Sequence, residues 1–531
     1  MATYTSAYTG AQIDAAIGSL IGTLNSIGVA GAAGFGVGIA PPEALPSGMV
    51  PLYGYTDPTH PNYGNYLYID GSVMCWIPKF YYKVGTGSNG LAVNVVDVKG
   101  VKTYATTFDA NAAGYALHRA FIDGGVEKSG FFVDKYMCSK NALGTGFVAS
   151  SILGGSPLST AAEHNPIGGL TATAGVNAYY AALIAPRARS GVNGAVDSNS
   201  PFFCCSRFIY SALALLSVAH GQAATSATNC AWYDGTGVKN FPKGCNNNAL
   251  KDVNDTAVTY QSDSYSNCGK TGSGTLFAKT THNGQPCGVA DLNGLMYEVS
   301  IGLTCVAASK TITGATQTNP CVITIAGHGY TTGQIVMITG VGGMTQINDK
   351  LYTITAINAD TFSLDGVNAT GYSAFTSGGS CTTGTFYAAK QATRMRDFTS
   401  GNTLATDHWG ATGVAAMMDA ITMPLLAAPG GSAFAQRFGN AANQVLSEAV
   451  AAPGRLLTGL GLPKDANGIS SAGTNLFGTD YFYQYIRNEL CALSGGGWYD
   501  SSDAGVWTLT LHDYRADYYS AVGFRCACYP A

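Results

Sequence analysis

Residues 498–520 read Trp498-Tyr-Asp-Ser-Ser-Asp-Ala-Gly-Val-Trp-Thr-Leu-Thr-Leu-His-Asp-Tyr-Arg-Ala-Asp-Tyr-Tyr-Ser520. Apolar and polar residues alternate in the middle of this window, which is the period of a β-strand. The alternation predicts a strand in which Leu509 and Leu511 face a core while Thr510 and His512 face outward. We therefore expect a buried scaffold that holds polar and aromatic side chains at a surface.

The outward set of this window has the composition of a binding surface. Tyrosine offers a large amphipathic contact area at a low cost in rotamer entropy, and Asp, His and Arg add directed hydrogen bonds. The alternative is a tyrosine-rich strand pair that packs on a neighbouring subunit. The candidate ligand-binding residues are Tyr499, Asp500, Asp503, Trp507, Thr510, His512, Asp513, Tyr514, Arg515, Asp517, Tyr518 and Tyr519.

Three ordered segments carry a family resemblance. They are Asp291-Leu-Asn-Gly-Leu-Met-Tyr-Glu298, Gly495-Gly-Gly-Trp498 and Val522-Gly-Phe-Arg-Cys-Ala527. They resemble signatures of the formylglycine-generating-enzyme (sulfatase-modifying factor) type of C-type-lectin fold. The chain departs from that family with Leu-Met-Tyr at 295–297, where Asn, Val and Trp are usual, and with Gly495, where Arg is usual. The resemblance implies a C-type-lectin-like domain.

The window also resembles the variable region of phage proteins diversified by retroelements, of the major-tropism-determinant type. Most of its candidate residues are types that changes in the first two bases of an Asn codon reach; Trp507 is not. The resemblance implies a non-enzymatic receptor-binding protein of a phage tail fibre or tail tip. The scaffold-like positions are Trp498, Ser502, Ala504, Gly505, Val506, Leu509, Leu511, Ser520, Gly523, Phe524 and Arg525.

Two other functions remain open. An oxidase of the formylglycine-generating type needs two cysteines between the last two signatures, and residues 498–524 contain none. Cys526 belongs to the Gly-Phe-Arg-Cys-Ala strand, so no catalytic residue is predicted. The third possibility is a structural baseplate or decoration protein without a receptor. We expect no enzymatic activity, no cofactor and no metal site.

Residues 308–380 differ in composition from the rest, with Thr, Ile and Gly in place of charges. Short β-rich runs begin at Val322, Gln334, Lys350 and Thr361, which predicts successive strands. The pattern from Gly327 to Gly371 resembles β-barrel modules inserted in phage structural proteins. In this interpretation His328 is a turn residue and not a ligand.

The N-terminal segment has an a/d pattern at Ile13, Ile17, Leu20, Leu24 and Ile27. That spacing predicts a short oligomerising helix, although two heptads are too few to associate without a larger assembly. The alternative is one helix packed on its own domain. From Gly28 the chain becomes rich in Gly and Ala up to Pro41-Pro42, which predicts a flexible linker.

An opening motif, Tyr4-Thr-Ser-Ala-Tyr-Thr-Gly-Ala-Gln-Ile-Asp14, resembles the start of phage tail and fibre proteins. With the a/d pattern it implies attachment to other virion tail proteins and assembly as a homotrimer. Its expected receptor is a protein or glycan on the host-cell surface. The expected location is the virion, after synthesis in the host bacterial cytoplasm.

The amino-acid composition argues against nucleic acid and membrane as binding partners. Charged residues are 11% of the chain against roughly 25% in ordinary soluble proteins, and the formal net charge is -4. Nucleic-acid binding needs clustered Lys and Arg, which do not occur. No apolar run approaches the roughly 20 residues of a membrane span, and no export signal is recognisable. The fourteen cysteines are therefore expected to be reduced, buried and structural.

The predicted fold class is α+β: a C-type-lectin-like fold with an inserted small all-β module and a short N-terminal oligomerising helix. Short strands are expected near 73–77, 80–84 and 130–136, and helical periodicity from Phe208 to His220. The predicted divisions are 1–43 for attachment and linker, 44–307 for the first part of the lectin-like domain, 308–380 for the β-module, and 381–531 for the second part with its variable region at 498–520.

Overall fold

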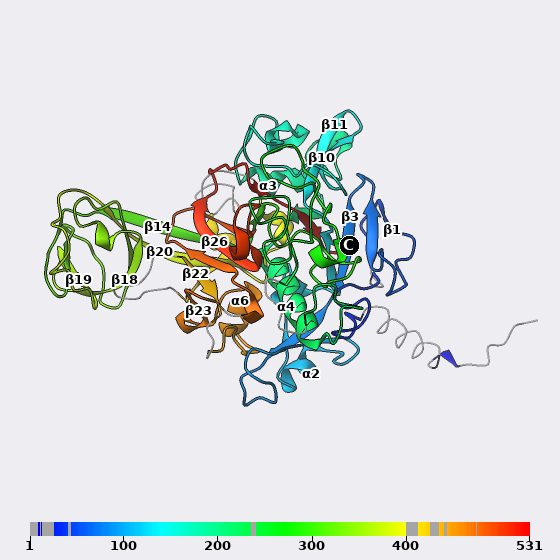
Figure 1. The fold of residues 1–531 in the computed structure, drawn as a ribbon, viewed down its shortest axis with the longest axis horizontal. Helices are drawn as coiled ribbons and strands as arrows, with labels where there is room; N and C mark the ends of the chain where they lie inside the picture. The colour runs from blue at the N-terminus through cyan, green and yellow to red at the C-terminus, as the bar shows by residue number, and fades with distance from the viewer. Residues whose placement is uncertain are drawn as a thin grey trace, which may run out of the picture.

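Strand is about twice as abundant as helix in this protein, at 30% against 16% of residues. The computed structural model describes residues 9–10, 12, 26–40, 44–234, 241–399, 413–424, 435–439, 443–473 and 475–530. Figure 1 shows a body of strands around helix α4 (Arg207–Ala223) and an arm that projects from one side and carries β18 (Lys350–Ala356) and β19 (Thr361–Leu364). This mixed, mainly antiparallel architecture agrees with the predicted α+β class.

The main sheet is organised around β26 (Gly505–Tyr514), the strand predicted from the alternating window. β26 pairs antiparallel with β25 on one side and parallel with β24 on the other. Leu509 and Leu511 are fully buried in the core, as the alternation predicted. In order, the seven strands are β23 (Ile469–Ser470), β22 (Ala435–Phe438), β24 (Tyr481–Gln484), β26, β25 (Leu490–Gly495), β13 (Tyr297–Ser300) and β27 (Val522–Gly523).

The three signature segments meet in this sheet. β13 and β27 pair in parallel, with Glu298 opposite Gly523. The Arg525 guanidinium donates from Nε and from a terminal nitrogen to the two carboxylate oxygens of Glu298, both at 2.6 Å. Both side chains are excluded from solvent. A buried charge is tolerated only when it is paired and hydrogen-bonded, so each of these two residues needs the other. The ion pair therefore holds together two segments that are more than 220 residues apart in the sequence.

A second sheet joins the beginning of the chain to its end. The predicted strands near 73–77 and 130–136 are confirmed as β3 and β9, and the C-terminal strand β28 inserts beside β9. The sheet order is β1 (Met49–Pro51), β2 (Asn65–Tyr68), β3 (Val73–Pro78), β9 (Gly130–Asp134), β28 (Cys526–Cys528) and β12 (Phe202–Cys204). The segment predicted at 80–84 forms β4 (Phe80–Val84) in a separate three-stranded sheet.

The predicted helix is α4, which begins after Ser206, whose hydroxyl accepts the backbone N–H of Ile209 as a cap. Every residue from Arg207 to His220 is buried, so α4 is the internal helix of the body. No helix of the described residues has the length and apolar character needed to cross a membrane.

The arm is a two-stranded ribbon that carries a small β-structure. β14 (Leu303–Thr311) and β20 (Ser380–Ala389) pair along their whole length, from Leu303 opposite Ala388 to Thr311 opposite Ser380. The predicted strands appear as β16 (Val322–Thr324), β17 (Ile335–Thr339), β18 and β19, around a hydrophobic cluster of their own. His328 lies in a turn: its Nδ1 accepts the N–H of Tyr330, and its Nε2 lies 2.9 Å from the Asn358 carbonyl oxygen.

The predicted linker is wrong for its described part. Ile27, Phe35 and Val37 are fully buried, and the Phe35 ring stacks on His220 of α4 at 5.2 Å. Gly36 has φ near +87°, and a Cβ there would lie 2.9 Å from His282. Glycine is therefore needed here for a close approach of the backbone to His282, and it does not indicate a flexible segment. The other residues of the a/d pattern, Ile13 to Leu24, lie outside the described residues, as does the opening motif up to Tyr8.

Candidate functional site

A cavity of about 370 Å³ opens where β24 and β26 meet the loops around Asp500 and Tyr519. That volume lies in the range of small-ligand pockets. Seven of the twelve candidate residues line it: Tyr499, Asp500, Asp503, Thr510, His512, Asp513 and Tyr519. The other lining residues are Tyr179, Tyr297, Tyr481, Tyr483, Leu493 and Val522.

Three further candidates lie on the surface next to this cavity. Tyr514 is 38% exposed and Tyr518 is 66% exposed, while Asp517 is half-buried. The Tyr514 ring lies under the Arg487 guanidinium at 4.7 Å from the ring centroid, a cation–π contact. Asp517 accepts the backbone N–H of Tyr514 at 2.9 Å and so closes the turn after β26.

Trp507 and Arg515 are not at the surface. Trp507 is fully buried, with its ring 5.3 Å from Phe477 and 6.0 Å from Phe438. It shares the strand face of Leu509 and Leu511, so the alternation already placed it inward. Arg515 is 3% exposed, and its backbone N–H donates to the Glu489 carbonyl. Both predictions of ligand contact are corrected.

Sequence reasoning missed the aromatic wall opposite the window. Tyr481, Tyr483 and Tyr485 alternate with buried Phe482 and Gln484, so their rings share one face of the chain around β24. Tyr481 stacks on Tyr483 at 5.5 Å, and the His512 ring packs edge-on against Tyr483 and Tyr485 at 5.2 and 4.5 Å. The signal was present in Tyr-Phe-Tyr-Gln-Tyr, whose period of two matches a strand.

The carboxylates of the cavity differ in their partners. Arg437 donates to both oxygens of Asp503, at 2.9 and 3.0 Å, in a bidentate pair. Asp500 accepts the N–H of Gly497 at 2.6 Å and bonds the Tyr297 hydroxyl. Burial raises the pKa of Asp500 to about 6, an increase that the Gly497 and Tyr297 hydrogen bonds reduce. Asp513 lies 3.2 Å from Nδ1 of His512.

Burial keeps the hydroxyl groups of four cavity tyrosines protonated at neutral pH. Burial raises the pKa of Tyr481 to about 12, and it raises the pKa values of Tyr179, Tyr297 and Tyr499 further above the ordinary value. Nearby carboxylates, Asp500 beside Tyr297 and Asp513 beside Tyr179, add to the increase. These four tyrosines therefore present neutral rings with hydroxyl donors, and the formal negative charge of the cavity comes from the aspartates.

The loop after β26 is held mainly through its backbone. The N–H groups of Tyr179 and Tyr180 donate to the carbonyl oxygens of Asp517 and Arg515, at 2.9 and 3.1 Å. Thr160 both donates to the Tyr519 carbonyl and accepts the Tyr519 N–H. These bonds use the backbone of the loop, so they do not depend on the side chains at positions 518 and 519.

The His164 side chain is bonded to the end of the same loop. Its Nδ1 lies 2.7 Å from the Ser520 carbonyl oxygen and its Nε2 lies 2.6 Å from Asp263. The imidazole stacks on Tyr265 at 4.1 Å and packs edge-on against Trp498. Asp263 and Cys268 complete a group of possible ligand atoms with His164, but both ring nitrogens of His164 already have partners.

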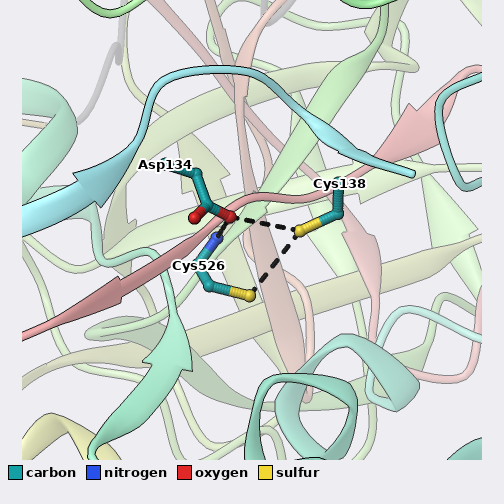
Figure 2. A group of neighbouring side chains, drawn as sticks. All are labelled: Asp134, Cys138 and Cys526. Atoms are coloured by element: carbon teal, nitrogen blue, oxygen red, sulfur yellow. Dashed lines mark hydrogen bonds between the residues drawn. The ribbon is translucent and has the colours of Figure 1, made fainter. Parts of the chain in front are cut away.

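A second group of possible metal ligands is buried between residues near 134–138 and the C-terminal strand β28. Figure 2 shows Asp134, Cys138 and Cys526 pointing toward one another, with the two sulfurs 3.6 Å apart. Asp134 is already bonded to both terminal nitrogens of Arg189, each at 2.7 Å, and to the N–H of Cys526. Burial raises the pKa values of both thiols. A buried carboxylate paired with arginine beside protonated thiols is a structural group and a poor metal site.

Comparison with known proteins gives one partial similarity. Residues 318–384 match the model of the ubiquitin-activating enzyme E1 FCCH domain. No curated protein matches the chain significantly. The similarity therefore concerns the arm, and the cavity lies on the part of the chain outside it.

Proposed function

We propose that this chain is a receptor-binding protein of a phage tail fibre or tail tip, and that it binds a host-cell surface ligand through a diversified C-type-lectin-like domain. The observation that carries the proposal is the division of residues 498–525 into two sets. The scaffold-like positions are nearly all buried, and most of the variable-type positions are exposed or line the cavity. A variable set that carried only the fold would not be arranged in this way.

The meeting of the signatures supports the lectin-like assignment. Glu298 and Arg525, which come from two of the three signature segments, form the buried pair described above, and β25 brings the Gly495 segment beside β13. Sequence similarity alone does not require these segments to touch. Fold does not imply function, so the assignment supports the location of the site and not its chemistry.

The remaining parts of the proposal rest on sequence. The N-terminal segment is proposed to attach the chain to other tail proteins and to assemble it as a homotrimer on the virion. Three copies of a weak site bind a cell surface far more tightly than one, because each later binding event is intramolecular. Neither nucleic acid nor membrane insertion is part of this function.

The experiment is an adsorption assay with a display variant. Replacing Tyr514, Tyr518 and Tyr519 together with Ala is expected to reduce adsorption of virions to host cells by at least about tenfold, since aromatic anchors contribute on the order of 2 kcal/mol each. The matched control is Tyr53→Ala, because Tyr53 is 88% exposed and lies outside the cavity lining. Circular dichroism melting checks that the variants are folded. Unchanged adsorption by a folded triple variant contradicts the proposal.

Two rivals have their own readouts. A structural baseplate role predicts the same adsorption for the triple variant and the wild type, provided that virions assemble. An oxidase role predicts stoichiometric copper or iron and oxygen consumption in the purified protein. The described lining of the cavity includes no cysteine, and all fourteen cysteines are buried, which argues against the oxidase.

A further inference from the structure

The charge balance of the cavity is one-sided. Three carboxylates, those of Asp500, Asp503 and Asp513, line it, and its described lining contains neither lysine nor arginine. Arg437 neutralises Asp503 alone. His512 is the titratable base of the lining, and it lies against Asp513. No lysine or arginine of the described lining therefore faces the carboxylates of Asp500 and Asp513.

The walls favour the same sign of ligand. Six tyrosines surround the cavity: Tyr179, Tyr297, Tyr481, Tyr483, Tyr499 and Tyr519. The face of an aromatic ring carries partial negative charge and attracts cations, by about 0.5 to 2 kcal/mol for each contact depending on desolvation. The rings can act on a ligand through their faces and through their hydroxyl groups. Carboxylates and ring faces thus act together on a bound cation.

We infer that the cavity binds a lysine or arginine side chain of a host surface protein, held between tyrosine faces and the Asp500 and Asp513 carboxylates. This inference rests on the proposed function, whose ligand class it names. Arginine is the better fit of the two, because its planar guanidinium stacks on aromatic rings and bonds carboxylates in a fork. A volume of about 370 Å³ suits one such side chain and its flanking backbone.

Other ligand sources fit less well. Phosphate, sulfate and acidic sugars bring negative charge toward unpaired carboxylates. Phosphocholine and phosphoethanolamine headgroups carry a phosphate beside their ammonium group, which meets the same repulsion. Neutral sugars stack on tyrosine but make no use of the charge. An amino sugar shares the cationic chemistry, and the experiment below separates it from a protein side chain.

The first test is calorimetric titration of the full chain with small probes. Nα-acetyl-arginine methylamide and Nα-acetyl-lysine methylamide are expected to bind at least about tenfold more tightly than Nα-acetyl-glutamine methylamide or methyl glucoside, a difference of about 1.4 kcal/mol. Nα-acetyl-glutamate methylamide is expected not to bind. Equal or tighter binding of the neutral probes overturns the inference.

The second test uses isosteric variants. Asp500→Asn with Asp513→Asn keeps the shape of the cavity and removes its unpaired charge, so affinity for the arginine probe should fall at least about tenfold. The control is Asp57→Asn, an exposed carboxylate outside the cavity lining. An unchanged affinity in the double variant contradicts the inference.

The third test identifies the source on the host cell and separates this inference from the proposed function. Trypsin treatment of host cells should abolish adsorption, and periodate oxidation of glycans should not; the reverse result overturns the assignment to a protein. If the triple tyrosine variant loses adsorption while the cationic probes fail to bind, the inference fails and the proposed function stands. If that variant adsorbs normally, the proposed function fails.

Discussion

Two adjacent stretches of the window 498–520, Gly505 to Leu511 and His512 to Ser520, differ in how far they are buried. From Gly505 to Leu511, the residues of β26 are buried between two strands of the sheet and under rings such as Phe477, although Thr510 also lines the cavity. From His512 to Ser520 the side chains are exposed or half-buried, apart from Arg515. One short segment therefore contains residues that stabilise the body and residues available to a ligand, with little overlap. Stability and recognition should respond to different substitutions.

The largest expected effect is on the buried side of this comparison. Arg525→Met leaves the Glu298 carboxylate buried without its partner, which should lower the free energy of unfolding by about 3 to 5 kcal/mol. Arg437→Met is the matched control, because the Arg437 pair with Asp503 is partly exposed and should contribute about 1 kcal/mol or less. Urea unfolding measures both. Similar losses of unfolding free energy in the two variants would contradict the distinction between the buried and the partly exposed ion pair.

Trp507→Phe tests the residue whose predicted role was corrected. The smaller ring leaves a gap beside Phe438 and Phe477, so the free energy of unfolding should fall by about 1 to 3 kcal/mol. Adsorption at a temperature where the variant is folded should equal that of the wild type. A stable variant that fails to adsorb would return Trp507 to the ligand-binding set.

Asp500 should couple stability to pH. Its pKa is raised to about 6 from an ordinary value of 3.8, so the folded state binds more protons than the unfolded state between those values, and stability falls as pH rises through that interval. The facing groups are Tyr297, Tyr499, Asp503 and the Gly497 N–H.

Asp500→Asn removes this cost. At pH 7 the variant should be more stable than the wild type by on the order of 1 to 2 kcal/mol, a value reduced for the partial exposure of the side chain. The difference should disappear near pH 4, which thermal melts at the two pH values measure. A variant that is equally stabilised at both pH values would exclude ionisation as the cause.

The smallest expected effect on the free energy of unfolding is in the more exposed stretch, His512 to Ser520. Tyr518→Ala removes a side chain that is 66% exposed, so the free energy of unfolding should change by less than about 0.5 kcal/mol. Tyr66→Ala is the contrasting variant, because Tyr66 is buried and its hydroxyl accepts the backbone N–H of Ala40; a loss of about 3 to 5 kcal/mol is expected there. A large loss from Tyr518→Ala would make the loop part of the core.

Local patterns in the sequence predicted the local structure. The period of two around Leu509 and Leu511 predicted β26 and its buried face, and the apolar spacing after Ser206 predicted α4. The part of the cavity that comes from distant segments could not be predicted in this way. Tyr179 and Tyr297 reach it from segments more than 200 residues away, and the parallel pairing of β24 with β26 has no local sequence signal.

The errors have physical causes as well. Arginine is usually found at the surface, so the sequence alone favours an exposed Arg515. Its burial follows from the packing of the loop against Tyr180. The glycines from Gly28 to Gly38 suggested flexibility, whereas the structure uses them to bring Phe35 and Val37 into the core. A glycine-rich run without other information does not distinguish a linker from a tightly folded segment.

The backbone bonds of the loop after β26 have a consequence for how this surface evolves. Every amino acid carries the carbonyl groups that Tyr179, Tyr180 and Thr160 use, and every amino acid except proline carries the N–H that Tyr519 donates. Substitutions at 518 and 519 therefore leave these backbone bonds in place, whereas Asp517 also uses its carboxylate to accept the N–H of Tyr514. Under the proposed function, single substitutions at these two positions change the exposed side chains while the backbone path of the loop is kept.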